Sequence, residues 1–210
     1  TAWDAVGEMH KDLRHSFAQR HKDGIQIFYK TDHHWTAEGA YYAYREVAEI
    51  LGFIPYSMDK FNLETLSNDF FGTTYSKSGF FFADSEEIKA PRIENGRYKV
   101  TIMDTNTEFD TLYDTSYLAK KDKYSTFLSG NNAHVKIYDT QNQEKETLLI
   151  IKDSFSHSLA PYLCEHYNIE LIDPRYYNGS IEDYIRENNI KNVLFLFGLD
   201  TLASANLIIR

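Results

Sequence analysis

Three side chains of this sequence, Ser154, His34 and Asp32, are of the types that nucleophilic acyl transfer requires. Ser154 follows four apolar residues, 148–151, which predict a strand buried on both faces, as in a parallel sheet. Helical spacing of apolar residues resumes after it. A serine there would face the crevice where open α/β sheets bind ligands, beside helix N–H groups that can stabilise an oxyanion. The alternative is that Ser154 only caps the helix.

A serine nucleophile needs a base, and the base needs an orienting acid. Asp32 and His34 are two residues apart at the end of a predicted strand, so their side chains would point to one side. Two alternatives stay open. The segment can be a surface turn, or Asp32, His33 and His34 can bind a metal, although the helical His spacing or cysteine spacing of zinc sites is missing.

Other polar residues are secondary candidates. His157 lies one turn from Ser154 and could be a rival base, although solvation on the helix surface is the expected state. Arg175 can stabilise an oxyanion or clamp an acidic substrate, or it can pair with Asp153 or Asp173. Asn131, after Gly130, can line the cleft or belong to a turn. We expect Trp35 to pack behind His34, with a carbohydrate platform as the lesser alternative.

Composition limits the classes of function. The 210 residues carry 42% apolar and 25% charged side chains, as in an ordinary soluble globular domain. The net charge of −9, without a basic cluster, argues against nucleic acid and anionic membranes as partners. The lone Cys164 excludes an intrachain disulfide and a cysteine-based zinc site. No apolar run approaches the ~20 residues that cross a bilayer, and because the chain begins at Thr1 we expect any signal peptide or anchor to lie outside it.

Periodicity predicts an α/β domain over residues 1–210 with a β-rich excursion at about 57–145. Thr36 and Gly52 are the predicted caps of the second helix. The predicted helices are 2–21, 37–51, 155–166, 180–189 and 200–208. The predicted strands are 24–30, 70–75, 98–103, 134–138, 147–152, 168–173 and 192–197. The alternation of strands and helices at the C-terminal end predicts a parallel sheet covered on both faces.

The segment Tyr29-Lys30-Thr31-Asp32-His33-His34-Trp35-Thr36, followed by Gly39-Ala40-Tyr41-Tyr42, resembles the signature of the DHHW family. That family resembles the alginate O-acetylation proteins, in which an Asp-x-His-Trp motif precedes an Asp-Ser-Phe segment, and both are similar to SGNH-type hydrolases and acetyltransferases. The resemblance covers essentially the whole chain. It implies a flavodoxin-like three-layer α/β/α sandwich with a parallel central sheet. It also implies Ser154 as nucleophile, His34 as base and Asp32 as orienting acid.

The oxyanion contributors are less clearly marked. Lys152 stands where the SGNH serine motif has glycine, and the usual oxyanion glycine and asparagine have no clear copies. By position, the loop after strand 168–173 and the loop after strand 192–197 should supply them. These loops offer Arg175, Tyr176, Asn178 and Gly179, and Gly198, Asp200 and Thr201.

The sequence therefore predicts a serine esterase or O-acetyltransferase that acts on acylated, in particular acetylated, glycans outside a bacterial cell. The expected partner is a polysaccharide or acylated carbohydrate, with a possible membrane anchor beyond this chain, and no metal or cofactor is required. One rival hypothesis is a non-catalytic carbohydrate-binding protein with the same cleft and no working oxyanion hole. The other is a metal-dependent hydrolase that uses Asp32 and His34.

Overall fold

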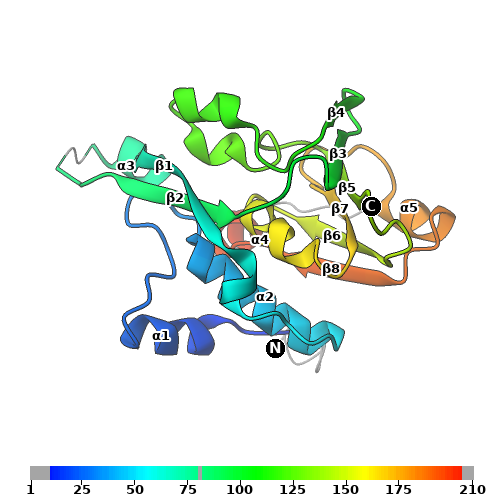
Figure 1. The fold of residues 1–210 in the computed structure, drawn as a ribbon, viewed down its shortest axis with the longest axis horizontal. Coiled ribbons are helices and arrows are strands. Elements are labelled where there is room, and N and C mark those ends of the chain that lie inside the picture. The colour runs from blue at the N-terminus through cyan, green and yellow to red at the C-terminus, as the bar shows by residue number, and fades with distance from the viewer. Residues whose placement is uncertain (1–9, 80–81, 205–210) are drawn as a thin grey trace. The chain divides into compact units, whose positions relative to one another are not determined.

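The computed structural model describes residues 10–79 and 82–204, and its contacts divide the chain into two compact units, Thr1–Arg92 and Ile93–Arg210. The first unit contains helices α1 (Arg14–Lys22), α2 (Ala37–Leu51) and α3 (Thr73–Ser78), the 3₁₀ turn η2 (Met58–Phe61), and strands β1 (Leu63–Phe70) and β2 (Glu86–Pro91). Figure 1 shows β1 and β2 as an antiparallel ribbon of two strands.

Helix α2 confirms the predicted caps. The Thr36 hydroxyl accepts a hydrogen bond from the Gly39 N–H at 3.1 Å, and Gly52 ends the helix with φ +75°, a conformation that favours glycine. Tyr44 and Ala48 are fully or nearly fully buried on its apolar face. The caps thus set the ends of α2, and the amphipathic pattern sets which face of the helix is buried.

Three other predictions in this unit need correction. Residues 24–30 do not form a strand, because their antiparallel pairing is limited to one bridge, Phe28 with Trp35. The first helix begins at Arg14, whose N–H donates a hydrogen bond to the Asp12 carboxylate at 3.0 Å, while the predicted residues 2–9 lie outside the described residues. The predicted strand 70–75 contains instead the end of β1 and the start of α3.

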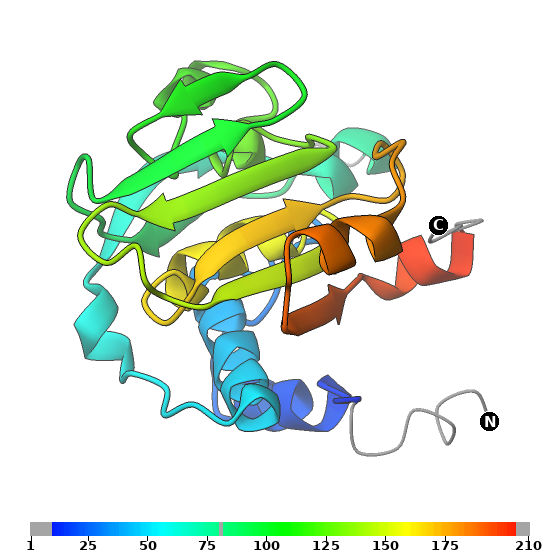
Figure 2. The ribbon, with the colours of Figure 1, turned by 90° about the vertical axis from the view of Figure 1, so that its right-hand side faces the viewer.

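The second unit contains a six-stranded sheet in the order β4-β3-β5-β7-β6-β8. Its strands are β3 (Tyr98–Ile102), β4 (Thr107–Phe109), β5 (His134–Asp139), β6 (Thr147–Lys152), β7 (Asn168–Ile172) and β8 (Asn192–Leu196). Its helices are α4 (Ser156–Leu163), α5 (Ile181–Glu187) and α6 (Leu199–Ser204), with 3₁₀ turns η3 (Thr115–Ala119) and η4 (Lys123–Thr126). Within this unit α4 and α5 lie on opposite faces of the sheet (Figure 2).

The sheet is mixed rather than parallel. Strands β7, β6 and β8 are parallel, as predicted, whereas β5 pairs antiparallel with β7, and β3 and β4 continue antiparallel beyond it. The molecule is therefore a mixed α/β protein, and the prediction of a parallel central sheet holds for three strands. In the described part of the chain, no helix has the length and apolar character needed to cross a membrane.

The two faces of the parallel strands have different partners. Leu149, Ile151 and Ile172 form one buried cluster with Ile181 at the start of α5. The intervening residues Leu148 and Ile150 are equally buried. Successive side chains of a strand point to opposite faces, so β6 is covered on both. Lys152 is the last residue of β6, and Asp153 and Ser154 follow it.

Candidate functional site

Asp32 and His34 form a buried hydrogen-bonded pair in the first unit. Their exposed fractions are 4% and 5%. Asp32 Oδ1 lies 2.5 Å from His34 Nδ1 and also accepts the His34 backbone N–H at 3.0 Å. The predicted placement of both side chains on one side of the segment is therefore correct, although the segment is a tight loop and not a strand.

The other carboxylate oxygen of Asp32 is bound by α3. Asp32 Oδ2 accepts hydrogen bonds from the Thr73 N–H at 2.7 Å and the Thr73 hydroxyl at 2.9 Å. Burial acts to raise the pKa of Asp32, but the hydrogen bonds and charge of His34, with the Thr73 N–H, outweigh it and hold the pKa well below its usual value. Asp32 is thus a carboxylate that places the proton of His34 on Nδ1, so Nε2 is the nitrogen that can accept one.

The contact between α3 and Asp32 explains why residues 73–78 are helical. A Cβ on Gly72 would come within 2.1 Å of the Asp32 Cβ, so only glycine permits this approach. Thr73, the first residue of α3, then presents its N–H to the carboxylate, an arrangement that favours a helix start. Gly72 and Thr73 lie 40 or more residues from Asp32 in sequence, and no short-range pattern marks them.

Glu86 anchors the same loop and was not singled out by the sequence. Its carboxylate accepts hydrogen bonds from the Lys30 N–H at 2.9 Å, the Thr31 N–H at 2.8 Å and the Thr31 hydroxyl at 2.6 Å. Trp35 is buried and meets Phe17 edge-to-face at 6.3 Å between ring centroids, while its packing behind His34 stays a prediction. The loop that carries Asp32 and His34 is therefore fixed by polar and aromatic contacts together.

A metal site is the alternative for the same residues. Asp32, His33 and His34 each offer one ligand atom, and these atoms lie within 4.8 Å of one another. However, Asp32 Oδ1 already accepts two hydrogen bonds and Oδ2 another two, and His34 Nδ1 faces the carboxylate. His33, which is partly exposed, contacts the Thr73 hydroxyl at 2.7 Å through Nδ1. A metal would have to replace several of these bonds, whereas a base needs none of them broken.

Ser154 lies in the second unit, in the turn between β6 and α4, and is half-buried. The cap position of α4 is Phe155 and no side chain caps this helix, so the structure does not support the capping role for Ser154. Asp153 holds the turn, because its carboxylate accepts the Phe155 N–H at 3.1 Å and the Gly198 N–H at 2.7 Å. The serine therefore follows a strand end that is tied to the loop after β8.

The four predicted oxyanion or substrate residues all lie in this unit. Arg175 makes a two-point salt bridge to Asp173, at 2.9 and 2.7 Å, which is one of its two predicted roles. Tyr176 is half-exposed, and the Arg175 guanidinium lies 5.4 Å from its ring centroid. Gly198 donates its N–H to Asp153, and Asn131 is exposed after a left-handed turn that includes Gly130. Their part in oxyanion or substrate binding stays a prediction.

His157 is not the solvated helix-surface histidine that the sequence predicted. It is 2% exposed, and its Nε2 lies 2.8 Å from Nζ of the equally buried Lys152. Lys152 Nζ also lies 3.4 Å from Asp173. Burial lowers the pKa of Lys152 to about 8, although Asp173 opposes this shift. An ammonium group near neutral pH thus faces the ring nitrogen of His157.

Comparisons with known proteins give a family and a fold. The model of the DHHW protein family matches residues 9–172. A crystal structure of a DHHW family protein from Eubacterium siraeum is similar, with TM-score 0.76 and 25% identity over 91% of this chain. The present chain spans 65% of that protein. Bacillus cereus PatB1 with a sulfonyl adduct is also similar, with TM-score 0.74 and 20% identity over 94% of this chain and 70% of PatB1. No curated protein matches.

Proposed function

The chain belongs to the DHHW family, and we propose that it hydrolyses or transfers acyl esters with Ser154 as nucleophile, His34 as base and Asp32 as orienting acid. The observation that carries this proposal is the buried Asp32–His34 pair, with Nδ1 of His34 held at 2.5 Å from the carboxylate. A buried carboxylate that fixes one histidine tautomer is the arrangement a general base needs. A purely structural role would not require the hydrogen bond between Asp32 and His34, because Thr73 already binds Asp32 and Glu86 already binds Thr31 of the same loop.

The chemistry proceeds in two balanced half-reactions. The Ser154 hydroxyl attacks the ester carbonyl carbon while His34 Nε2 takes its proton, and the imidazolium then gives that proton to the departing alcohol oxygen. The product is an acyl-serine. Water or a sugar hydroxyl attacks this ester in the second half-reaction, His34 takes the proton of the attacking group, and Ser154 recovers it. Asp32 stays ionised and stabilises the imidazolium in both steps.

The sulfonyl adduct of PatB1 supports a nucleophile in this fold. A sulfonyl electrophile becomes attached to a protein when a nucleophilic side chain displaces its leaving group, which parallels acylation of a serine. The N–H of Ser154 and one neighbour from the loops after β7 and β8 would bind the oxyanion. Arg175, Tyr176 and Gly198 come from these loops, and Asn131 from the turn before β5.

The proposed substrate is an acylated, in particular acetylated, polysaccharide outside the cell. Such a substrate is consistent with the net charge of −9, which disfavours nucleic acid, and with a mechanism that needs no cofactor. We propose an extracellular or cell-surface location for the chain. Hydrolysis and transfer share the acyl-serine and differ only in the second nucleophile, water or a sugar hydroxyl.

The test compares the wild type with Ser154→Ala and, as a matched control, with Ser57→Ala, which removes an exposed hydroxyl elsewhere. We expect wild type and control to release p-nitrophenol from p-nitrophenyl acetate and to react with a fluorophosphonate probe at Ser154. Ser154→Ala should lose labelling and at least about 10³-fold in rate. Unchanged turnover in Ser154→Ala, with loss of activity in a chelator, would favour the metal-dependent hydrolase. Glycan binding without turnover or labelling would favour the binding protein.

A further inference from the structure

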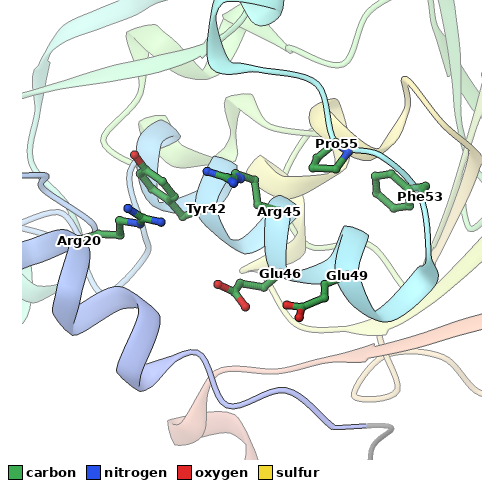
Figure 3. A pocket seen from close by; sticks show the side chains of 7 residues that line it. All are labelled: Arg20, Tyr42, Arg45, Glu46, Glu49, Phe53 and Pro55. Atoms are coloured by element: carbon green, nitrogen blue, oxygen red, sulfur yellow. The ribbon is translucent and has the colours of Figure 1, made fainter.

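A cavity in the first unit lies on α2, between its outer face and the end of α1 (Figure 3). Its volume is about 270 Å³. The polar lining consists of Arg20 from the last turn of α1 and of Tyr42, Arg45, Glu46 and Glu49 from α2. The α2 residues are spaced at i, i+3, i+4 and i+7, so they share one face of the helix. Phe53 and Pro55, just beyond α2, complete an apolar wall.

The two carboxylates of the cavity are both bound by groups outside its lining. Lys11 Nζ lies 3.0 Å from Glu46 and makes a second, shorter salt bridge to Glu49. Glu46 also accepts a hydrogen bond from the Ser16 hydroxyl at 2.6 Å. These contacts, with a longer-range contribution from Arg45, hold the pKa of Glu46 below its usual value although burial opposes the shift. Both carboxylates therefore have partners other than the two arginines.

The two arginines are less well paired. The Arg20 guanidinium lies over the Tyr42 ring, 4.8 Å from its centroid, and its carboxylate neighbour, Asp23, is at 3.9 Å. Its Nε is buried and has no hydrogen-bond partner among the described residues. A buried donor without a partner is uncommon in folded proteins. For Arg45, no carboxylate of the described part of the chain lies within salt-bridge distance.

We propose that this cavity binds a small organic anion, a carboxylate or a phosphate ester, attached to a ring or another compact apolar body. Guanidinium groups recognise both anions through paired N–H donors. Tyr42, Phe53 and Pro55 supply apolar surface for the carbon part. The cavity volume lies just below the range of about 300–1,000 Å³ typical of drug-sized ligands, so it suits a single ring. The site is independent of the Ser154 chemistry.

The test uses three probes of one shape, namely benzoate, phenyl phosphate and the neutral benzyl alcohol, in calorimetric titrations of the whole chain. We expect saturable binding of at least one anion with a dissociation constant below about 10 mM, and binding of benzyl alcohol at least about tenfold weaker. Tighter binding of phenyl phosphate would identify phosphate esters as the ligand class, and tighter binding of benzoate would identify carboxylates.

Substitutions locate the site. Arg45→Gln, on an exposed side chain, should weaken anion binding by about tenfold or more, because a charge-assisted hydrogen bond is lost. Arg20→Gln should do the same if the variant folds. Lys22→Gln removes one positive charge from the exposed end of α1 without lining the cavity and should leave affinity within about twofold. The proposal is wrong if neither anion saturates below about 10 mM, or if Arg45→Gln binds the preferred anion as the wild type does.

Discussion

Two buried histidines of this chain face opposite charges. His34 Nδ1 meets the carboxylate of Asp32, whereas His157 Nε2 meets the ammonium of Lys152. Both are nearly inaccessible to solvent; His34 is the predicted base, and His157 lies close in sequence to the predicted nucleophile, Ser154. A proton on His34 would be stabilised by the neighbouring carboxylate, but a proton on His157 would place two like charges side by side. The two rings are therefore suited to different tasks.

This difference is the reason why His34, and not His157, is the proposed base. During acyl transfer the base must carry a positive charge for a short time, and Asp32 offers that charge a partner. The Nε2 lone pair of His157 accepts a hydrogen bond from Lys152, so that nitrogen is not available to take a proton without loss of the contact. His34 is the proposed base for this reason, and His157 belongs to a buried polar cluster under the turn that carries Ser154.

The largest effect is expected for His34→Gln, and its comparison with His157→Gln tests directly which histidine is the base. Loss of the base should lower kcat/KM for p-nitrophenyl acetate by a factor of at least about 10⁴, since a triad member is removed. His157→Gln keeps an oxygen that can accept from Lys152 and should change kcat/KM by less than about tenfold. Thermal melts of both variants control for folding. The reverse ranking of the two variants would make His157 the base.

The next effect concerns Asp32→Asn. The amide must turn its N–H donor toward either His34 or Thr73, and both of these groups are donors themselves. We therefore expect the free energy of unfolding to fall by about 1–3 kcal/mol. Activity should fall by a factor on the order of 10²–10⁴, because the wrong tautomer of His34 is favoured. Steady-state kinetics and denaturant titration measure the two quantities. Asp59→Asn, on an exposed side chain, is the matched control.

The same substitution also changes how the free energy of unfolding depends on pH in acidic solution. Because folding lowers the pKa of Asp32 below its usual 3.8, the carboxylate stabilises the wild type above that pH and the contribution is lost as pH falls through the lowered value. Asp32→Asn should therefore have a flatter dependence of unfolding free energy on pH below about 4. Wild-type activity within about twofold, together with parallel acid limbs, would remove Asp32 from the mechanism.

Local patterns predicted the elements whose causes are local. Thr36 and Gly52 lie beside the helix they cap, and the apolar run of β6 is continuous, so both elements were recognised. Strand pairing depends on distant partners, and the antiparallel pairing of β5 with β7 broke the expected parallel order. The extended segment 24–30 found no partner beyond Phe28 with Trp35 and did not become a strand.

In the candidate site, too, the sequence predicted the local contacts and missed the contacts between distant residues. The spacing of Asp32 and His34 predicted that their side chains point to one side, although it assumed a strand and the segment is a loop. The contact of Asp32 with Thr73 spans 41 residues, so no periodicity could show it. His157 was expected at the surface because a histidine on a helix is usually solvated, and its buried partner, Lys152, is the last residue of β6. A buried lysine is rare enough to be recognised only in the structure.

The smallest expected effect tests the charge that faces His157. Lys152, at the end of β6, contacts His157 of α4 and Asp173, which directly follows β7. Its other charged neighbours are Arg175 and Asp153. Folding lowers the pKa of Lys152 from 10.5 to about 8, so between these values the unfolded chain binds more protons than the folded one. The contribution of Lys152 to the free energy of unfolding therefore rises with pH, by about 2 kcal/mol between about pH 7 and 9.5.

Lys152→Met removes this rise. Denaturant titrations across that pH range should show the wild type gaining stability relative to the variant, while Lys191→Met, on an exposed lysine of the same unit, should follow the wild type. Tyrosines that titrate at high pH act on all three proteins alike and cancel in the difference. Parallel curves for wild type and Lys152→Met would mean that burial does not lower the pKa of Lys152. A rise of about 3 kcal/mol over the same range would mean that Lys152 is already neutral at pH 7, and the contrast between His34, beside a carboxylate, and His157, beside a cation, would then be lost.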